Sequence, residues 1–211
     1  MKKDQTGHHF LARLGKTRLR PGGRFATEWL INQTRFAPDT QVLEVACNMG
    51  TTAVGLAQRF GCHITGVDLD ENALNKARQN IRAAGLESLV QVQHANATGL
   101  PFPDNSFDVV INEAMLTMLP LANKEMAVAE YFRVLKPGGV LLTHDVVVSE
   151  QNTEEAVERL RDTIQVKVTP LTESAWTDLF HRSGFRDITT ISGGMTLLSP
   201  RGLIYDEGWR R

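Results

Sequence analysis

The sequence predicts a doubly wound α/β domain with a mostly parallel, seven-stranded sheet and helices on both faces. Short apolar, β-branched runs alternate with amphipathic helical patterns along most of the chain, and this alternation is typical of βαβ units. A chain of 211 residues with 42% hydrophobic and 22% charged residues has a globular composition. We therefore expect a single domain over 1–211, with an arm and covering helix over 1–36, a core over 37–148 and closing elements over 149–211.

Seven segments are predicted as strands because they are short and rich in Val, Ile, Leu or Phe. They are 41–45, 63–67, 89–92, 107–111, 140–148, 185–191 and 195–198, the last two joined around Gly193-Gly194. Pro101 and Pro103 lie between the third and fourth strands. Because proline cannot donate to a strand ladder, we expect a loop there.

The segments between the strands predict helices with recognisable ends. A helix over 24–36 should cover one sheet edge, another should begin at Thr51 or Thr52 as its cap and end at Gly61, and a third should run from Asp70 to Gly85. Further helices are expected over 123–135, ahead of a turn at 136–139, and from Thr172 to Ser183-Gly184.

Composition also narrows the function classes. Two cysteines, Cys47 and Cys62, are too few for a disulfide framework and favour a reducing, cytoplasmic location. The longest apolar run, 140–148, contains His144 and Asp145 and is far shorter than the ~20 residues of a membrane span. Six histidines without ligand spacing predict no metal site. A net charge of −1 argues against nucleic acid as a partner, although residues 1–24 carry +6 and could form a basic arm.

The residues after each predicted strand are the candidates for a binding site, since ligands of open α/β sheets bind beyond the carboxyl ends of the strands. Small side chains follow the first strand, where the start of the next helix offers free N–H groups to a negative group. Asp68 follows the second strand and suits the two hydroxyls of a ribose. Asn96 and Ala97 follow the third and could bind the edge of a nucleobase. Together they predict a nucleoside site.

Four blocks in this order resemble the class I S-adenosylmethionine-dependent methyltransferases, and most of all the small-molecule branch with the ubiquinone/menaquinone methyltransferases. The similarity covers about residues 21–192, and the blocks are 42–50 (VLEVACNMG), 66–68 (GVD), 96–108 (NATGLPFPDNSFD) and 133–139 (RVLKPGG). The resemblance implies a Rossmann-like methyltransferase fold and an enzyme that transfers a methyl group from S-adenosylmethionine to an unidentified small-molecule acceptor, with S-adenosylhomocysteine as product.

The resemblance also implies roles for matching residues. The loop from Glu44 to Gly50 would hold the methionine end of the cofactor, with Asn112 and Glu113 beneath the methionine and the transferred methyl. Asp68 would bind the ribose, Leu69 would pack on the adenine, and Asn96 with the Ala97 N–H would bind the adenine edge. Gly23 would belong to a segment that closes over the methionine end. The predicted cofactor residues are Gly23, Glu44, Ala46, Cys47, Asn48, Gly50, Asp68, Leu69, Asn96, Ala97, Asn112 and Glu113.

Two departures leave alternatives open. The family's first loop has glycine where this chain has Ala46 and Asn48. At the adenine-binding position, this chain has Asn96 where the family more commonly has Asp. Asn tolerates a positive φ, whereas Ala46 adds a methyl where backbone meets cofactor. A non-catalytic S-adenosylmethionine-binding protein is therefore one alternative. An NAD-dependent oxidoreductase is the other, since an acidic residue after the second strand, here Asp68, also serves a ribose in that class; against it, Gly50 is the only glycine in this turn.

Candidates for catalysis follow the fourth and fifth strands. A general base is needed only if the acceptor is protonated, and Glu113 and His144 (with Asp145) are the candidates. Each also has a structural interpretation, as a helix-capping or cofactor-binding carboxylate and as a hydrogen-bonded histidine. Cys47 is expected to be a buried apolar residue. Other residues are expected either to line an apolar acceptor site or to belong to the core, namely Met115, Met118, Trp176 and Met195.

Overall fold

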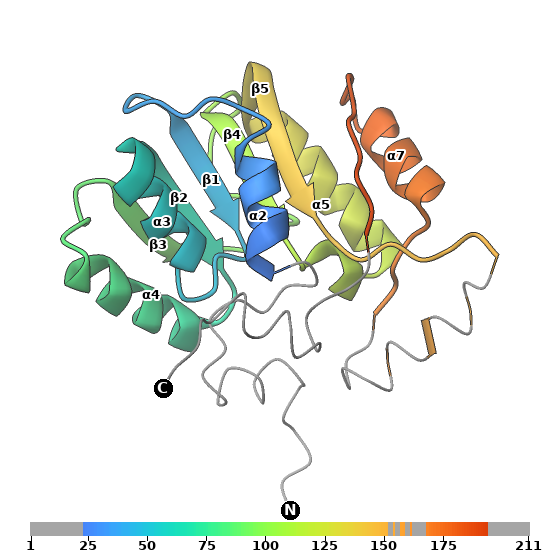
Figure 1. Cartoon of the computed structure of the whole chain (residues 1–211), viewed down its shortest axis with the longest axis horizontal. Coiled ribbons are helices and arrows are strands. Elements are labelled where there is room, and N and C mark those ends of the chain that lie inside the picture. The colour runs from blue at the N-terminus through green and yellow to red at the C-terminus, as the bar shows by residue number, and fades with distance from the viewer. Residues whose placement is uncertain (1–22, 152–153, 155–156, 159–160, 162–167, 194–211) are drawn as a thin grey trace, which may run out of the picture. The chain divides into compact units, whose positions relative to one another are not determined.

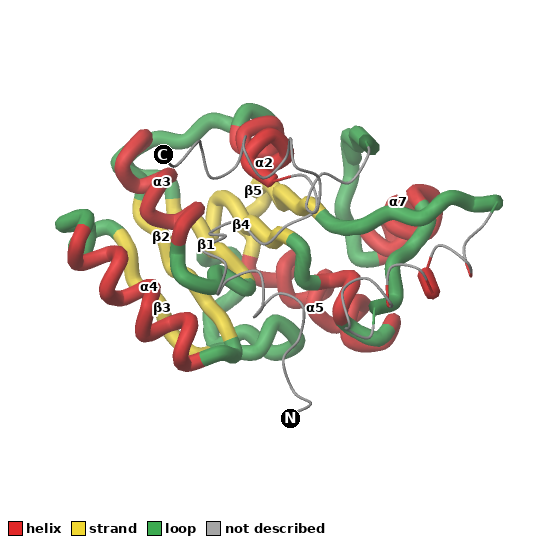
Figure 2. The backbone as a smooth tube through the Cα atoms, turned by 60° about the horizontal axis from the view of Figure 1, so that its bottom comes forward, coloured by secondary structure: helices red, strands yellow, loops and turns green. Residues whose placement is uncertain are grey.

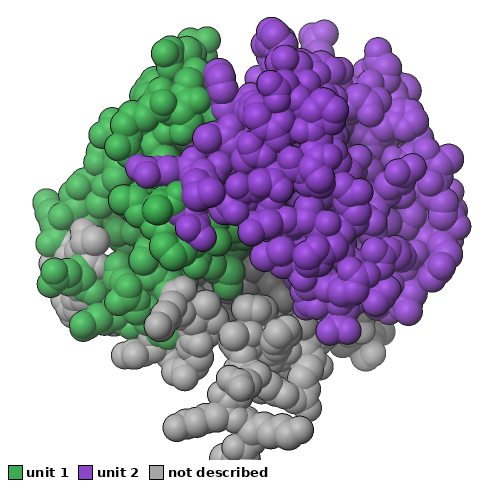
Figure 3. All heavy atoms as spheres, turned by 180° about the vertical axis from the view of Figure 1, so that it is seen from behind, with its two compact units in different colours: residues 1–29, 114–122, 144–211 green, residues 30–113, 123–143 purple. Residues whose placement is uncertain are grey.

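The computed structural model describes residues 23–151, 154, 157–158, 161 and 168–193. The chain divides into two compact units, each built from several segments (Figure 3). Unit 1 comprises 1–29, 114–122 and 144–211, and unit 2 comprises 30–113 and 123–143. The expectation of a single domain over 1–211 stays a prediction, and the units are described in turn.

Unit 2 contains a five-stranded sheet in the order β3-β2-β1-β4-β5. The strands are β1 Gln41–Val45, β2 His63–Asp68, β3 Val90–His94, β4 Phe107–Glu113 and β5 Leu135–His144, whose last residue belongs to unit 1. The pairings of β1 with β2, β1 with β4 and β2 with β3 are parallel. The chain moves outward from β1 to β3 and returns to β4 on the other side of β1. This reversal makes the carboxyl ends of β1 and β4 the expected binding position.

The central strands are buried because helices cover both faces of the sheet. Val42, Leu43 and Val110 are completely inaccessible to solvent, as expected for parallel strands with continuous apolar runs. Figure 1 shows α3 (Thr51–Phe60) in front of the sheet and α5 (Leu121–Val134) behind it. Figure 2 shows α3 beside α4 (Glu71–Ala83). The predicted doubly wound α/β fold class is confirmed.

Most predicted helix ends are correct, and one cap is not. The Asp70 side chain accepts a hydrogen bond from the Asn72 N–H at 2.9 Å, and Gly61 caps the end of α3. The residue before α3 is Gly50, with φ +71° and no side-chain cap, so Thr51 and Thr52 lie inside the helix. The first-turn N–H groups of α3 therefore have no side-chain cap of their own.

Unit 1 contains the first residues of α2 (Gly23–Ile31), the short 3-10 helix η1 (Leu116–Met118) and α7 (Glu173–Arg182). Helix α2 is five residues shorter at its end than predicted. The Thr172 hydroxyl caps α7 by accepting from the Ala175 N–H at 3.3 Å. No helix of the described segments combines the length and apolarity that a membrane span requires.

The prediction of a sixth strand over 185–191 is wrong, because the described residues after α7 contain no strand. The Phe185 N–H donates to the Phe180 carbonyl at 3.1 Å, and Asp187 has φ +53°, which interrupts an extended backbone. The seventh strand, 195–198, lies outside the described residues. Strand β5 also ends at His144 instead of 148, since the Asp145 carboxylate accepts from the Val146 N–H at 2.9 Å.

Candidate functional site

The predicted site lies at one edge of the sheet, within unit 2. Register pairs Val45 with Val67 and with Asn112, and Asp68 with His94. The carboxyl ends of β1 to β4 are therefore neighbours, and in Figure 1 the arrowheads of β1 and β2 point to the same edge. The structure gathers at these strand ends the predicted residues Glu44, Ala46, Cys47, Asn48, Gly50, Asp68, Leu69, Asn96, Ala97, Asn112 and Glu113.

The loop after β1 is left-handed at every second residue. Ala46 has φ +58°, Asn48 +49° and Gly50 +71°. These are the three positions where the resemblance places glycine, so the chain keeps the glycine conformation without two of the glycines. A left-handed alanine costs about 1–2 kcal/mol, and the surrounding contacts must supply that energy.

Hydrogen bonds to β2 and α4 hold this loop in place. The Cys47 N–H donates to the Val67 carbonyl at 3.0 Å, and the Asn48 N–H donates to the Asp68 carboxylate at 2.8 Å. The side-chain amide of Asn80, on α4, donates to the Met49 carbonyl at 2.9 Å. The loop conformation therefore depends on its neighbours as well as on its own residues.

Cys47 packs inward against β2. Its side chain is 3% exposed, and a Cβ built on Gly66 would lie 2.9 Å from its sulfur. Burial, with smaller contributions from the nearby carboxylates Glu44 and Asp68, raises the pKa of the Cys47 thiol far above its usual value. The thiol is neutral at pH 7 and serves packing, because only the thiolate is a strong nucleophile.

Asp68 joins the loop after β1 to the start of α4. One carboxylate oxygen accepts from the Asn48 N–H at 2.8 Å and the other accepts from the Asp70 N–H at 2.9 Å. Each oxygen keeps acceptor capacity for a second donor. The next residue, Leu69, leaves 59% of its surface exposed. An acceptor pair and an exposed apolar side chain thus lie next to each other at the end of β2.

The turn after β3 presents Asn96. Its side-chain oxygen accepts from the Thr98 N–H at 3.0 Å, and Asn96 and Gly99 form an antiparallel bridge. Ala97 is buried within this turn. Asn96 itself is exposed, so the turn offers a fixed polar edge to a planar group.

Asn112, at the end of β4, carries a buried polar atom that lacks a partner. The residue is completely buried, and its side-chain amide donates to the Val45 carbonyl at 3.2 Å. Its side-chain oxygen makes no hydrogen bond in the described part of the structure. A buried unpaired acceptor costs about 1–3 kcal/mol. The Val45 carbonyl to which Asn112 donates places this oxygen directly beside the loop after β1.

Unit 1 contains the remaining predicted residues, Gly23 and His144. Gly23 is buried, begins α2 and has φ +54°. His144 ends β5, and its carbonyl accepts from the Ala114 N–H at 2.7 Å. The neighbouring Asp145 accepts from the Thr117 hydroxyl and N–H and from the Val146 N–H, and burial raises its pKa. Asp145 therefore holds η1 in place.

The residues considered for an apolar acceptor site differ in exposure. Met118 is 37% exposed, whereas Trp176 is 9% exposed and donates its indole N–H to the Val146 carbonyl at 3.0 Å. Met115 also belongs to unit 1, and Met195 lies outside the described residues. In the described part of the chain, no cluster of three or more His, Cys, Asp or Glu side chains is placed to hold a metal ion.

Comparison with known protein families identifies a methyltransferase domain in this chain. The methyltransferase-domain family matches residues 42–139, which span β1 to the first half of β5 and include most of the site. This chain belongs to the class I S-adenosylmethionine-dependent methyltransferases. The predicted family and enzyme class are thereby confirmed.

Two relatives of this methyltransferase differ in the share of their own length that this chain matches. It is 64% identical over 208 residues to an uncharacterised protein of Haemophilus influenzae, across 99% of this chain and 83% of that protein. It is 39% identical over 113 residues to demethylmenaquinone methyltransferase of Listeria welshimeri, across 53% of this chain and 47% of the relative.

A solved structure extends the comparison to most of the methyltransferase. The phosphoethanolamine N-methyltransferase 2 of Haemonchus contortus, in complex with phosphomonomethylethanolamine and S-adenosylhomocysteine, has a TM-score of 0.75 and 22% identity. The matched region covers 89% of this chain and 44% of the Haemonchus contortus enzyme. The methyltransferase thus spans about half the length of these two named enzymes, and at 22% identity the second shows the fold alone.

Proposed function

We propose that this methyltransferase transfers the methyl group of S-adenosylmethionine to a small-molecule acceptor, with the cofactor held at the carboxyl ends of β1 to β4. The observation that carries the proposal is the left-handed loop Ala46–Gly50, which is joined through Asn48 to the Asp68 carboxylate. The Asp68 carboxylate, proposed to bind the ribose, is thereby hydrogen-bonded to the loop that leads into α3, and the first turn of α3 lacks a side-chain cap.

The residues present fit S-adenosylmethionine along its length. Asp68 has acceptor capacity for two hydroxyls, and exposed Leu69 offers an apolar surface to the adenine. Asn96 and the Ala97 N–H would bind the adenine edge. At the other end, the unpaired Asn112 oxygen and the loop from Glu44 would receive the amino acid portion. Gly23, in unit 1, is proposed to contact the methionine end.

The chemistry asked of the protein is mainly alignment, because the sulfonium carries an activated methyl group when it is bound. Holding the acceptor atom in line with the methyl can supply roughly 7–11 kcal/mol of the barrier. An acceptor that is protonated also needs a base, which adds about 10²–10⁴-fold. Glu113 is proposed for that role and His144 is the second candidate.

Binding calorimetry tests the cofactor site. We expect S-adenosylhomocysteine to bind and NAD not to bind, and tight NAD binding without S-adenosylhomocysteine binding would overturn the proposal. Asp68→Ala should weaken binding by at least about tenfold, or about 1.4 kcal/mol. Asp68→Asn keeps one acceptor, so its affinity should lie between those of the wild type and Asp68→Ala. Asp178→Ala, on the exposed face of α7, is the matched control.

A second candidate function is non-catalytic binding of S-adenosylmethionine, which Ala46 and Asn48 favour by replacing glycines. The two functions differ in turnover. Incubation with methyl-labelled S-adenosylmethionine and a metabolite extract should give a labelled small molecule and S-adenosylhomocysteine. Cofactor binding with no label transferred to any acceptor would favour the non-catalytic protein.

A further inference from the structure

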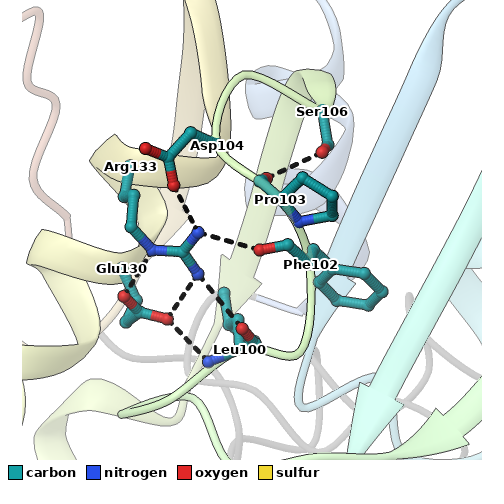
Figure 4. Close-up of polar contacts among 7 residues, drawn as sticks. All are labelled: Leu100, Phe102, Pro103, Asp104, Ser106, Glu130 and Arg133. Carbon is teal, nitrogen blue, oxygen red and sulfur yellow. Dashed lines mark hydrogen bonds and ion pairs between the residues drawn. The ribbon is translucent and has the colours of Figure 1, made fainter.

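Arg133, on α5, makes an extended set of contacts outside the predicted cofactor residues. Its guanidinium donates to both carboxylate oxygens of Glu130, at 2.7 and 2.8 Å, and to the Asp104 carboxylate at 2.7 Å. It also donates to the backbone carbonyls of Leu100, at 3.1 Å, and Phe102, at 2.8 Å (Figure 4). Four different residues thus receive hydrogen bonds from one side chain.

The contacted segment, 100–106, lacks regular structure of its own. Pro101 and Pro103 have no N–H, and Asn105 is left-handed at φ +57°. The last turns of α5 supply its partners instead: the Glu130 carboxylate accepts from the Leu100 N–H at 2.7 Å, and the Val134 carbonyl accepts from the Ser106 N–H at 2.8 Å. We call Glu130 and Arg133 together the loop clamp.

The loop clamp acts on the turn that presents Asn96. Leu100 is 5% exposed and bonds to both clamp residues: its N–H donates to Glu130 and its carbonyl accepts from Arg133. It directly follows Gly99, which pairs with Asn96 in the antiparallel bridge. The exit of the turn is therefore fixed from α5, while its entry is fixed by the pairing of β3 with β2.

Charge and burial make this clamp stronger than a surface ion pair. The Arg133 and Glu130 side chains are 31% and 20% exposed, compared with 69% for Asp104. The hydrogen bonds from Arg133 lower the pKa of Glu130, so the carboxylate is ionised at neutral pH. Two parallel N–H···O bonds fix the orientation of the guanidinium, and its remaining N–H groups are thereby directed at the loop carbonyls.

We propose that Arg133 is a positioning residue that sets the adenine specificity of the cofactor site through the loop 100–106. The inference rests on the proposed function, since it takes Asn96 as the residue that binds the adenine edge. Arg133 does not contact Asn96 in the described structure. It holds the backbone of Leu100, which directly follows the bridge between Gly99 and Asn96. Loss of the clamp should therefore affect recognition of the base more than the methionine end or the methyl transfer.

The test compares two probes that differ at the adenine amino group. S-adenosylhomocysteine carries that group, and S-inosylhomocysteine has an oxygen in its place. We expect the wild-type protein to bind S-adenosylhomocysteine about tenfold more tightly than S-inosylhomocysteine. In Arg133→Lys, which keeps the charge but loses the planar fork, the ratio should fall to about two, while kcat at saturating cofactor stays near the wild-type value.

Three further variants grade the effect. Glu130→Gln keeps an acceptor for the Leu100 N–H but loses the ion pair, so its ratio should be intermediate. Asp104→Ala removes only the exposed contact, and its ratio should equal the wild-type ratio. Arg186→Lys is the matched control, because Arg186 also donates to two backbone carbonyls, those of His181 and Phe185.

The outcomes separate the clamp from the site. Equal weakening of both probes in Arg133→Lys, with an unchanged ratio, would mean that the clamp is structural only and would overturn the inference. If Arg133→Lys does not fold, the ratio in Glu130→Gln decides in the same way. Wild-type protein that binds neither probe would instead contradict the proposed function.

Discussion

Gly66 offers a direct test of how the cofactor loop is seated on the sheet. A Cβ added there would lie 2.9 Å from the Cys47 sulfur, 3.0 Å from a Val92 methyl and 3.1 Å from the Cys47 Cβ. Real Cβ atoms essentially never approach a neighbour below 3.0 Å. We therefore expect Gly66→Ala to force the Cys47 side chain, and the backbone between Ala46 and Asn48, away from β2.

The loss of folding stability expected for Gly66→Ala follows from the number of tight contacts that the new methyl group would make. Overpacking a filled core by a methyl group costs about 1–3 kcal/mol, and three contacts near 3 Å on two residues place Gly66→Ala at about 2 kcal/mol in that range. In a protein of this size, 1 kcal/mol lowers Tm by roughly 2–4 °C, so a decrease of about 4–8 °C is expected. The affinity for S-adenosylhomocysteine should also fall, because the displaced backbone carries the Asn48 N–H that is bonded to Asp68.

The assay is a double-mutant cycle of denaturant unfolding with Gly66→Ala, Cys47→Ala and the pair. Cys47→Ala alone should cost about 1 kcal/mol for one buried sulfur atom. It removes the atom at 2.9 Å, so the pair should be more stable than the sum of the single changes predicts, by about 1 kcal/mol. Purely additive changes, or a Gly66→Ala protein as stable as wild type, would refute the packing argument.

Three other substitutions test separate contacts of the site. Asn80→Ala should weaken S-adenosylhomocysteine binding several-fold and cost about 1 kcal/mol of stability, because it leaves the Met49 carbonyl without its donor; calorimetry on Lys76→Ala, an exposed position of the same helix, is the control. Ala46→Gly should stabilise the protein by about 0.5–1 kcal/mol, since glycine relieves the strain at φ +58° but adds freedom to the unfolded chain; Ala53→Gly, inside α3, should be destabilising in the same unfolding experiment. Folding lowers the pKa of Glu130, chiefly through the hydrogen bond from Arg133. The ionised Glu130 side chain therefore stabilises the folded protein fully above its unfolded pKa, near 4.5. This stabilisation is lost as the pH falls through the lower pKa of the folded state. The stability difference between wild type and Glu130→Gln should therefore shrink in unfolding experiments below about pH 4, and a difference that is constant from pH 7 to pH 3 would contradict the pairing.

The central sheet could be predicted from the sequence because its strands are local and repetitive. Short, mainly apolar runs such as 41–45 and 107–111 have few alternatives in a parallel sheet, and Pro101 with Pro103 separates the second run clearly from the strand before it. The closing strand over 185–191 was predicted from the same kind of run and is absent. There the aromatic Phe185 packs on Phe180 of α7 with ring centroids 6.2 Å apart, a local contact at the end of the helix that outweighs β propensity.

The residues at the strand ends could be predicted because topology alone brings them to one edge. The residues that hold them in place could not, because Asn80, Glu130 and Arg133 lie on helices. On a helix, the sequence spacing tells which face a residue occupies but not which distant carbonyl its side chain reaches. An exposed arginine in a helical pattern is most simply interpreted as a solvated charge, and only the packing of α5 on the loop 100–106 distinguishes Arg133 from such a residue.

The same division explains how the cofactor loop can dispense with two glycines. A loop that adopts left-handed angles through its own flexibility needs glycine at each such position. Here Asp68, on β2, and Asn80, on α4, fix the Cys47–Asn48 and Met49–Gly50 peptide units, so the conformation is imposed from outside and Ala46 and Asn48 can occupy it. Strain of about 1–2 kcal/mol at Ala46 is comparable to the net contribution of two such hydrogen bonds, about 0.5–1.5 kcal/mol each. The replacement of glycine is therefore compatible with a preformed site, and it makes the outer contacts, more than the loop residues, the determinants of its shape.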